Sequence, residues 1–433
     1  MFDFIQYPNM EKSSALLRQL GLVSAVALVV SNMVGSGIFT ASGFLARDLG
    51  DPKWLFAIGA IVSLAGAFCY SELGVNFPSS GGEYVYLTQA YGPSWGFMTG
   101  WASLFAGFSA PIAASALAFS NYVGYFFPQF QQDAAALVIG PEWFQIRIGG
   151  AQILACLLIG LLTVINILGV VRAAKFQNVM TAAKLTILGL FIFFGLAAGT
   201  GDWSHFSQPA VRETTNSIFA QFAISLCFIY MAYSGWNAAT YVAEELKQPA
   251  RTLPLALTIG TAFVAVLFIL MNVVYVYAIP MEEMKGVVAV GALAASKLFG
   301  SGVAGIFSGL MALSLVPTIN AMVTVGPRVY YAMAKNGAFL RMAANVDERW
   351  HTPVQAIILQ GVVSMVMTLT PFPSLLTFIG LTLNFFAVLS VASLFRFRKR
   401  PNWQKLGVVS FAWPLMPAIF MIVGTWMVIY GFI

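Results

Sequence analysis

The feature that most constrains this chain is a series of long apolar stretches separated by short loops. We place eleven of them, at 20–46, 53–76, 94–124, 148–170, 175–199, 216–245, 253–279, 301–334, 353–371, 374–395 and 414–433. An apolar helix of about 20 residues crosses a hydrocarbon core of roughly 30 Å. Barrel strands would alternate polar and apolar residues over about 10 positions, and no such alternation is present. The sequence therefore predicts an all-α membrane protein with about eleven transmembrane helices. A twelfth span beginning near Asn402 would need a break at Trp413-Pro414, and we favour eleven.

The composition agrees with a chain that is solvated mainly by lipid. Of the 433 residues, 59% are hydrophobic and 9% are charged, against roughly 25% charged in soluble domains. The net charge of +6 does not indicate nucleic acid, because the basic residues lie in short loops between the apolar stretches. The three cysteines lie inside apolar stretches, so we expect free thiols rather than a disulfide framework. His205 and His351 fall in loops without a metal-binding pattern, so we expect no metal and no cofactor.

The distribution of Lys and Arg predicts the orientation. With a cytoplasmic N-terminus, the inner side carries Lys12, Arg18, Arg172, Lys175, Lys247, Arg251, Arg328, Lys335, Arg341, Arg349, Arg396, Arg398, Lys399, Arg400 and Lys405. The outer side carries Arg47, Lys53, Arg147, Arg212, Lys285 and Lys297. This is 15 against 6, and cytoplasmic loops are enriched in Lys and Arg. We therefore expect a multi-pass protein of the plasma membrane (the inner membrane in a bacterium) with its N-terminus in the cytoplasm.

Two long stretches contain helix-breaking residues in mid-run. The first carries Gly35-Ser36-Gly37 and the sixth carries Ser234-Gly235. Glycine costs a helix roughly 1 kcal/mol relative to alanine, so each run has a weak point at membrane depth. Small residues also permit close helix packing, which is the simpler explanation of one such site. Two breaks at matched positions in the two halves instead favour an inverted-repeat transporter with a midplane site.

Around these breaks the chain resembles the amino acid–polyamine–organocation superfamily, and within it the L-type amino acid transporter branch. The similar segments are Asn32-Met33-Val34-Gly35-Ser36-Gly37-Ile38-Phe39, Cys69-Tyr70-Ser71-Glu72-Leu73-Gly74, Ser80-Gly81-Gly82-Glu83-Tyr84-Val85-Tyr86, Tyr233-Ser234-Gly235-Trp236-Asn237 and Gly326-Pro327-Arg328-Val329-Tyr330-Tyr331. The resemblance implies a leucine-transporter-like 5+5 inverted repeat with broken first and sixth helices. The expected parts are a cytoplasmic segment at 1–19, repeats at 20–200 and 216–396, and a loop with a last helix at 397–433.

The two breaks suggest how an amino acid zwitterion is bound. Burying a carboxylate and an ammonium is costly unless dipoles or charges compensate each of them. We assign the carboxylate to the amides of Ser36 and Gly37 and to the Ser36 hydroxyl, because a helix N-terminus favours anions. We assign the ammonium to carbonyls of Met33, Met231 and Ser234. The full set of expected substrate-binding residues is Met33, Val34, Gly35, Ser36, Gly37, Ile38, Met231, Ser234, Gly235 and Asn237, with Met231 at the gate, where L-type relatives usually place phenylalanine.

Lys184 is the only basic residue well inside an apolar stretch. A charge at the bilayer centre costs at least roughly 2.5–3.5 kcal/mol, so its side chain should face partners inside the bundle. A lysine that reaches an interface is the simpler interpretation, and it suits Lys175. The resemblance implies instead that Lys184 replaces the cation of sodium-coupled relatives, bridging the first break and the eighth span. There Thr318 and Ser314 share a helix face.

The remaining acidic residues have simpler interpretations. We expect Glu72 and Glu83 to cap or pair at the inner surface, with a proton-coupling role as the alternative. Arg328 is expected to contact lipid or Glu83, and Glu244-Glu245 to pair with Lys247 or Arg251. The stretch around Glu83 is expected to form a short helix at the interface or over an inner vestibule.

The leading functional hypothesis is a transporter of neutral L-amino acids that works by alternating access, as a sodium-independent exchanger or uniporter. A proton-coupled symporter is the near rival, and a transport-dead sensor is less favoured. The sequence shows no filter loop of the kind a channel needs. It also shows no converging catalytic groups of the kind an enzyme needs. The loop from Tyr125 to Arg147 has no cysteine, so we expect no disulfide-linked heavy chain, and a monomer or weak homodimer. We expect a small amino acid and the lipid bilayer, and no nucleic acid, as partners.

Overall fold

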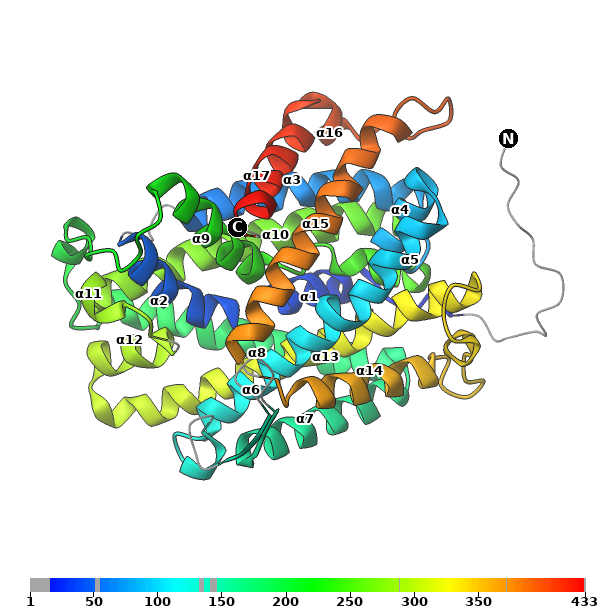
Figure 1. Cartoon of the computed structure of the whole chain (residues 1–433). Helices are drawn as coiled ribbons and strands as arrows, with labels where there is room; N and C mark the ends of the chain where they lie inside the picture. The colour runs from blue at the N-terminus through cyan, green and yellow to red at the C-terminus, as the bar shows by residue number, and fades with distance from the viewer. Residues whose placement is uncertain are drawn as a thin grey trace.

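The chain folds into a bundle of helices that run back and forth between two ends (Figure 1). The computed structural model describes residues 16–50, 55–131, 136–140, 146–287, 289–370 and 372–431. The helices of the first half are α1 (Leu22–Met33), α2 (Gly37–Leu49), α3 (Leu55–Asn76), α4 (Glu83–Tyr91), α5 (Pro93–Ala102), α6 (Ala110–Val123), α7 (Gly150–Ile167) and α8 (Val170–Ala197). Those of the second half are α9 (Ile218–Tyr233), α10 (Pro249–Ala278), α11 (Met281–Met284), α12 (Val290–Phe299), α13 (Ser301–Lys335), α14 (Val354–Met367), α15 (Phe372–Phe397), α16 (Gly407–Phe411) and α17 (Leu415–Gly431).

Shorter elements join or interrupt these helices. They are the π-helical stretch η1 (Ser103–Ser109), the 3-10 helices η2 (Pro128–Phe130), η3 (Trp203–Ser207), η4 (Ala238–Glu245) and η5 (Arg341–Ala344), and the strands β1 (Ala136–Ile139) and β2 (Ile146–Gly149). The two strands pair antiparallel between α6 and α7, with Ala136 opposite Gly149. The sequence predicted only a loop in this segment. The hairpin was not predicted because runs of four residues are too short to show the alternation of a strand.

The helices confirm the predicted membrane architecture. Within the described ranges, eight helices or helix pairs are long and apolar enough to cross a membrane. Shorter apolar helices lie at the remaining predicted positions, in α14, α15 and α17. Together these elements match the eleven predicted stretches. The expected N-terminal segment lies mostly outside the described residues, and the repeat boundaries at 20–200 and 216–396 stay a prediction.

Apolar side chains cover much of the outer face of the bundle. On α7, Ile153, Leu157, Leu161 and Val164 are all more than half exposed. These positions recur every three or four residues, so they form one stripe along one face of the helix. A contiguous apolar stripe of this kind is not stable against water in a monomer. The stripe therefore faces lipid.

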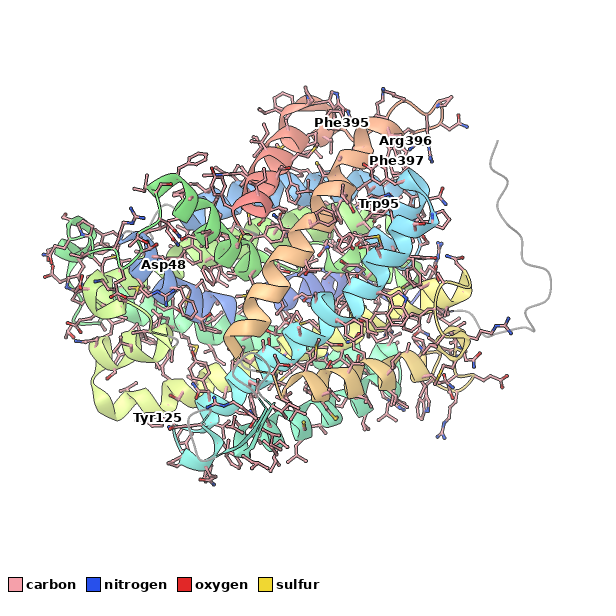
Figure 2. The ribbon with its side chains drawn as sticks, viewed as in Figure 1. Asp48, Trp95, Tyr125, Phe395, Arg396 and Phe397 are labelled. Atoms are coloured by element: carbon pink, nitrogen blue, oxygen red, sulfur yellow. The ribbon has the colours of Figure 1, made fainter. Side chains whose placement is uncertain are left out.

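The two ends of the bundle are distinguishable by the residues that lie there. Asp48, near the end of α2, and Tyr125, after α6, lie towards the left in Figure 2. Trp95, near the start of α5, and Arg396, near the end of α15, lie towards the right. The right-hand end is also where α1 begins, and we call it the N-terminal end of the bundle.

The two interrupted spans cross in the middle of the bundle. The first span consists of α1 and α2, and the sixth consists of α9 and η4. α1 packs against η4, and α2 packs against α9. The first half of each span thus packs against the second half of the other. Two antiparallel broken helices pack in this way when their breaks lie side by side.

Candidate functional site

The first break replaces helix with a tight turn of three residues. α1 ends at Met33 and α2 begins at Gly37. The amide of Gly35 donates to the carbonyl of Met33 over 2.9 Å, which closes the turn. Ser36 precedes the first residue of α2, so the amides of Ser36 and Gly37 point out of the start of that helix. In the described part of the chain no acceptor bonds these two amides. Free amides at a helix start suit a carboxylate.

The second break lies between Tyr233 and Ala238. Ser234 adopts an extended conformation, with φ −55° and ψ 143°, and so ends α9. Gly235 has φ 105°, a region that residues with a side chain rarely adopt. The amide of Ser234 donates to the carbonyl of Met231 over 3.1 Å. The helical hydrogen bonds are therefore interrupted at the residues that the sequence analysis predicted.

The breaks contact each other through glycines. A methyl group on Gly235 would lie 2.8 Å from the carbonyl carbon of Asn32, at the end of α1. A methyl group on Gly37 would lie 2.5 Å from the Cα atom of Ala232, in α9. Neither contact leaves room for a side chain. The close approach of the two broken helices thus depends on glycine on each side.

We expect Gly235→Ala to lower amino acid uptake at least about ten-fold, because strain of roughly 1–3 kcal/mol falls on the break. The added methyl group would also push Asn32 away. The measurement is uptake by reconstituted protein, normalised to the amount of folded protein. Gly189→Ala is the matched control, since nothing lies within 4 Å of a methyl group there. Equal uptake by the two variants would contradict this account of the break.

Lys184 of α8 binds at the first break. Its ammonium donates to the carbonyl of Val34 and to the hydroxyl of Thr318, each over 2.6 Å. The Thr318 hydroxyl also donates to the same carbonyl, over 2.7 Å. The Lys184 side chain is only 1% exposed. Lysine thus lies where the sequence analysis expected it, between the break and α13, whereas its functional role stays a prediction.

A chain of polar side chains continues from this lysine towards the N-terminal end of the bundle. Thr181 contacts the hydroxyl of Ser31 over 2.6 Å and accepts from Gln177. Gln177 accepts from Asn320, which in turn accepts from Asn166. All five side chains are buried. This network was not predicted from the sequence. Single amide and hydroxyl side chains in apolar helices form no recognisable sequence pattern, and their contacts exist only once the helices pack together.

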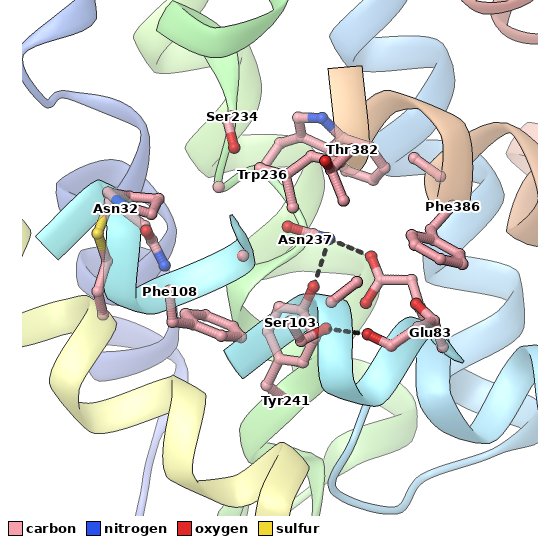
Figure 3. Close-up of a pocket in the computed structure, with 18 of the residues that line it drawn as sticks. Asn32, Glu83, Ser103, Phe108, Ser234, Trp236, Asn237, Tyr241, Thr382 and Phe386 are labelled. Carbon is pink, nitrogen blue, oxygen red and sulfur yellow. Dashed lines mark hydrogen bonds between the residues drawn. The ribbon is translucent and has the colours of Figure 1, made fainter. Parts of the chain in front are cut away.

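A cavity lies beside the second break (Figure 3). The cavity has a volume of about 50 Å³. Its wall comes from Asn32 of α1, from the second break, and from α4, α5, η1, α6, α9, η4, α13 and α15. The labelled lining residues in Figure 3 are Asn32, Glu83, Ser103, Phe108, Ser234, Trp236, Asn237, Tyr241, Thr382 and Phe386. The wall therefore combines aromatic rings with a few polar groups, as in many small-molecule sites.

Glu83 is the acidic group in this wall. Its Oε1 atom accepts from Asn237 over 2.6 Å and from Tyr70 over 3.0 Å. α4 lies between the membrane-spanning segments, and burial there raises the pKa of Glu83 above its ordinary value. Hydrogen bonds from Tyr241, the backbone, Tyr70 and Asn237 offset part of that rise. The predicted helix at this position is confirmed as α4, which packs against α5 and α15, and its expected place at the interface or over an inner vestibule stays a prediction.

The structure brings together only part of the expected substrate-binding set. Ser234, Gly235 and Asn237 line the cavity, whereas the expected residues 33–38 of the first span do not, and Ile38 is fully buried in the apolar core. The carbonyl of Val34 is occupied by Lys184 and Thr318. The carbonyls of Met33 and Met231 each accept one backbone hydrogen bond, from Gly35 and Ser234, and since a carbonyl can accept two, their expected roles as ammonium sites stay predictions. Of the three expected carbonyls, Ser234 is the one without an acceptor role in the described chain.

Two other expected site residues lie outside the cavity lining. The hydroxyl of Ser314 donates to the carbonyl of Met311 over 2.7 Å within its own helix, and its expected role beside Lys184 stays a prediction. The Met231 side chain packs against a buried apolar cluster that includes Ile319 and Ile379, away from the cavity lining. Its role as a gate stays a prediction.

The ion pairs of the N-terminal end also differ from expectation. Arg328 pairs with Glu245 rather than Glu83, through contacts of 2.7 and 3.2 Å. Glu72 pairs with Arg398 and also accepts from the indole of Trp403. These pairs join residues more than 80 positions apart, which a local sequence pattern does not reveal. No cluster of three or more metal-ligating side chains occurs within the described ranges.

Comparison with known proteins decides the family. A family model described as amino acid permease matches residues 20–433. The chain belongs to the amino acid permease family. This permease is 30% identical to the mouse large neutral amino acids transporter small subunit 2, over 95% of this chain and 77% of the relative. It is 30% identical to the serine/threonine exchanger SteT of Bacillus subtilis, over 96% of this chain and 92% of the relative. It is 31% identical to the human b(0,+)-type amino acid transporter 1, over 82% of this chain and 70% of the relative.

These relatives confirm the resemblance to the L-type branch of the superfamily. They also confirm that the permease is a membrane transporter of amino acids and not an enzyme. The broken first and sixth helices, which the sequence predicted, agree with that assignment. The cavity beside the second break is the candidate amino acid site.

Proposed function

We propose that this permease exchanges neutral L-amino acids across the plasma membrane by alternating access, without sodium. The observation that carries the proposal is the ammonium of Lys184, which donates to the carbonyl of Val34 at the break. The lysine amino group at this point supplies the contacts to the break that a bound cation would otherwise make. The amides of Ser36 and Gly37, which have no acceptor in the described part of the chain but lie outside the cavity lining, are then available for the substrate carboxylate, and the carbonyl of Ser234 for its ammonium.

The size and lining of the cavity support a small or medium substrate. A cavity volume of about 50 Å³ suits a substrate with a short side chain. Asn237 and Ser103 offer hydrogen bonds, while Phe108 and Phe386 offer apolar contact. The relatives are named for large neutral amino acids in one case and for serine and threonine in another. Serine, threonine and alanine are therefore the first substrates to test.

The proposed orientation places the N-terminal end of the bundle in the cytoplasm. The count of 15 basic residues against 6 supports it. We further propose that the permease works as a monomer or weak homodimer, without a disulfide-linked heavy chain. The three cysteines lie in the helices α3, α7 and α9, and the loop from Tyr125 to Arg147 contains none.

The exchange is tested with purified protein in liposomes. We expect labelled serine to enter vesicles loaded with unlabelled serine faster than empty ones, because the return step is faster with substrate bound. Replacing external sodium by choline should leave the rate unchanged. Uptake that requires sodium would contradict the assignment of Lys184. A chain that binds serine without any exchange would be a sensor rather than a transporter.

A further inference from the structure

The carboxyl group of Glu83 lies beside the cavity and lacks a cationic partner among the described residues. Its residue is 7% exposed, and it lines the cavity next to Asn237. In the described part of the chain, no Lys or Arg forms an ion pair with it. The nearby arginines of the same end are committed elsewhere, Arg328 to Glu245 and Arg398 to Glu72.

The groups that face Glu83 are neutral. Tyr70 comes from α3, Tyr241 from η4 and Tyr230 from α9, and Tyr86 lies one turn along α4 itself. Asn237 and Tyr70 donate hydrogen bonds to the carboxyl group. No other titratable group faces it from α5, η1 or α15 among the residues that line the cavity. Among the described residues, an ionised Glu83 would therefore be stabilised only by hydrogen bonds from neutral donors.

Burial of a carboxylate without a cation is costly, and the group avoids the cost by binding a proton. The cost depends on water. When the cavity is closed and holds few waters, the neutral form is favoured. When the cavity opens to bulk water, the carboxylate is hydrated and the proton is released. Opening and closing of the site thus change the number of protons that Glu83 holds.

We propose that Glu83 is a proton-binding site through which net uptake of a neutral amino acid carries one proton in the same direction. Outer water supplies the proton to the carboxylate before the cavity closes, and the carboxylate returns it to inner water after the cavity opens. The inference rests on the proposed transport of neutral amino acids. Exchange carries a proton on both legs and so produces no net proton movement, which separates the two claims.

The position of Asn237 explains how a proton and a substrate become linked. This side chain belongs to the second break and donates to Glu83 over 2.6 Å. It also donates to the hydroxyl of Tyr241 over 2.9 Å. A substrate that contacts Asn237 alters the hydrogen bonds that Glu83 receives. The charge of Glu83 and the occupancy of the site therefore influence each other, as linkage requires.

The first experiment measures the wild-type permease in empty liposomes. An acidic outer solution and an inner-negative potential should each drive accumulation of labelled serine, because each cycle moves one positive charge inward. A pH-sensitive dye inside the vesicles should report acidification when serine is added. Exchange in loaded vesicles is measured on the same preparation. Intact exchange without acidification overturns the proton inference alone, whereas loss of exchange overturns the proposed function.

The second experiment assigns the proton to Glu83. Each variant is normalised to its own exchange rate, because Glu83 belongs to the binding site. Glu83→Gln should lose acceleration by external acid, and serine should no longer acidify the vesicle lumen. Glu244→Gln is the matched control: this half-buried acid accepts from the amide of Ser80 and does not line the cavity. Persistent acid-driven uptake in Glu83→Gln would overturn the assignment.

A third variant keeps the carboxyl group and changes one of its partners. Tyr70→Phe removes a donor that stabilises the ionised form, so the pKa of Glu83 should rise further above its ordinary value. The pH at which uptake is half-maximal should then move to a higher pH. If Glu83→Gln is inactive in exchange, this shift decides the question. An unchanged profile in Tyr70→Phe would mean that Glu83 serves only to hold Asn237 in place.

Discussion

Replacing Lys184 by alanine lowers amino acid exchange by about 100-fold or more while the protein remains folded. The ammonium makes two short hydrogen bonds, to the Val34 carbonyl and the Thr318 hydroxyl. Each hydrogen bond to a charged group contributes roughly 1.5–3 kcal/mol. Without them the turn at residues 34–36 loses its link to α8 and keeps only the Thr318 hydroxyl as its link to α13. The measurement is exchange in liposomes beside the unfolding temperature in detergent.

The control for this variant lies on the same helix. Lys175 is exposed on α8, nine residues towards the N-terminal end, so Lys175→Ala should exchange at the wild-type rate. Thr318→Ala is informative too, since it removes one partner and leaves the lysine with Val34. We expect an intermediate loss. Full exchange by Lys184→Ala would show that the break keeps its shape without the ammonium, and the proposed replacement of a cation would then be untenable.

The sequence was sufficient to predict the features that depend on local chemistry. Apolar length gave the spans, and the glycine positions gave both breaks. Lys184 was recognisable because a lysine in the middle of an apolar helix must find partners. Each of these inferences uses residues that are near one another in the chain. The fold class follows from such signals, whereas the contact of Lys184 with the first break and α13 was implied by the resemblance to the superfamily.

The features that the sequence did not predict depend on which helices meet. Glu83 looked like a surface acid, because its place in the cavity wall requires α4 to pack against α5 and α15. The partner of Arg328 was assigned to the wrong acid for the same reason. Long-range packing decides both.

The largest effect on stability is expected for the ion pair between α13 and η4. Arg328 and Glu245 are 1% and 0% exposed, and their side chains meet through two contacts of 2.7 and 3.2 Å. Arg328→Met should lower the free energy of unfolding by roughly 3–5 kcal/mol, because it leaves the Glu245 carboxylate buried without a cation. Unfolding in mixed micelles measures the change. Arg341→Met replaces an exposed arginine of the same end and should have almost no effect.

A double variant separates the cost of a broken pair from the value of the intact one. Combining Arg328→Met with Glu245→Gln removes both charges, so most of the lost stability should return. The backbone carbonyl of Glu245 still accepts from the amides of Gln19 and Leu20, which keeps the start of α1 against η4. If the double variant were no more stable than Arg328→Met, an unpaired carboxylate would not be the cause of the loss. The packing of the arginine stem between α13 and η4 would then account for the stability of this end of the bundle.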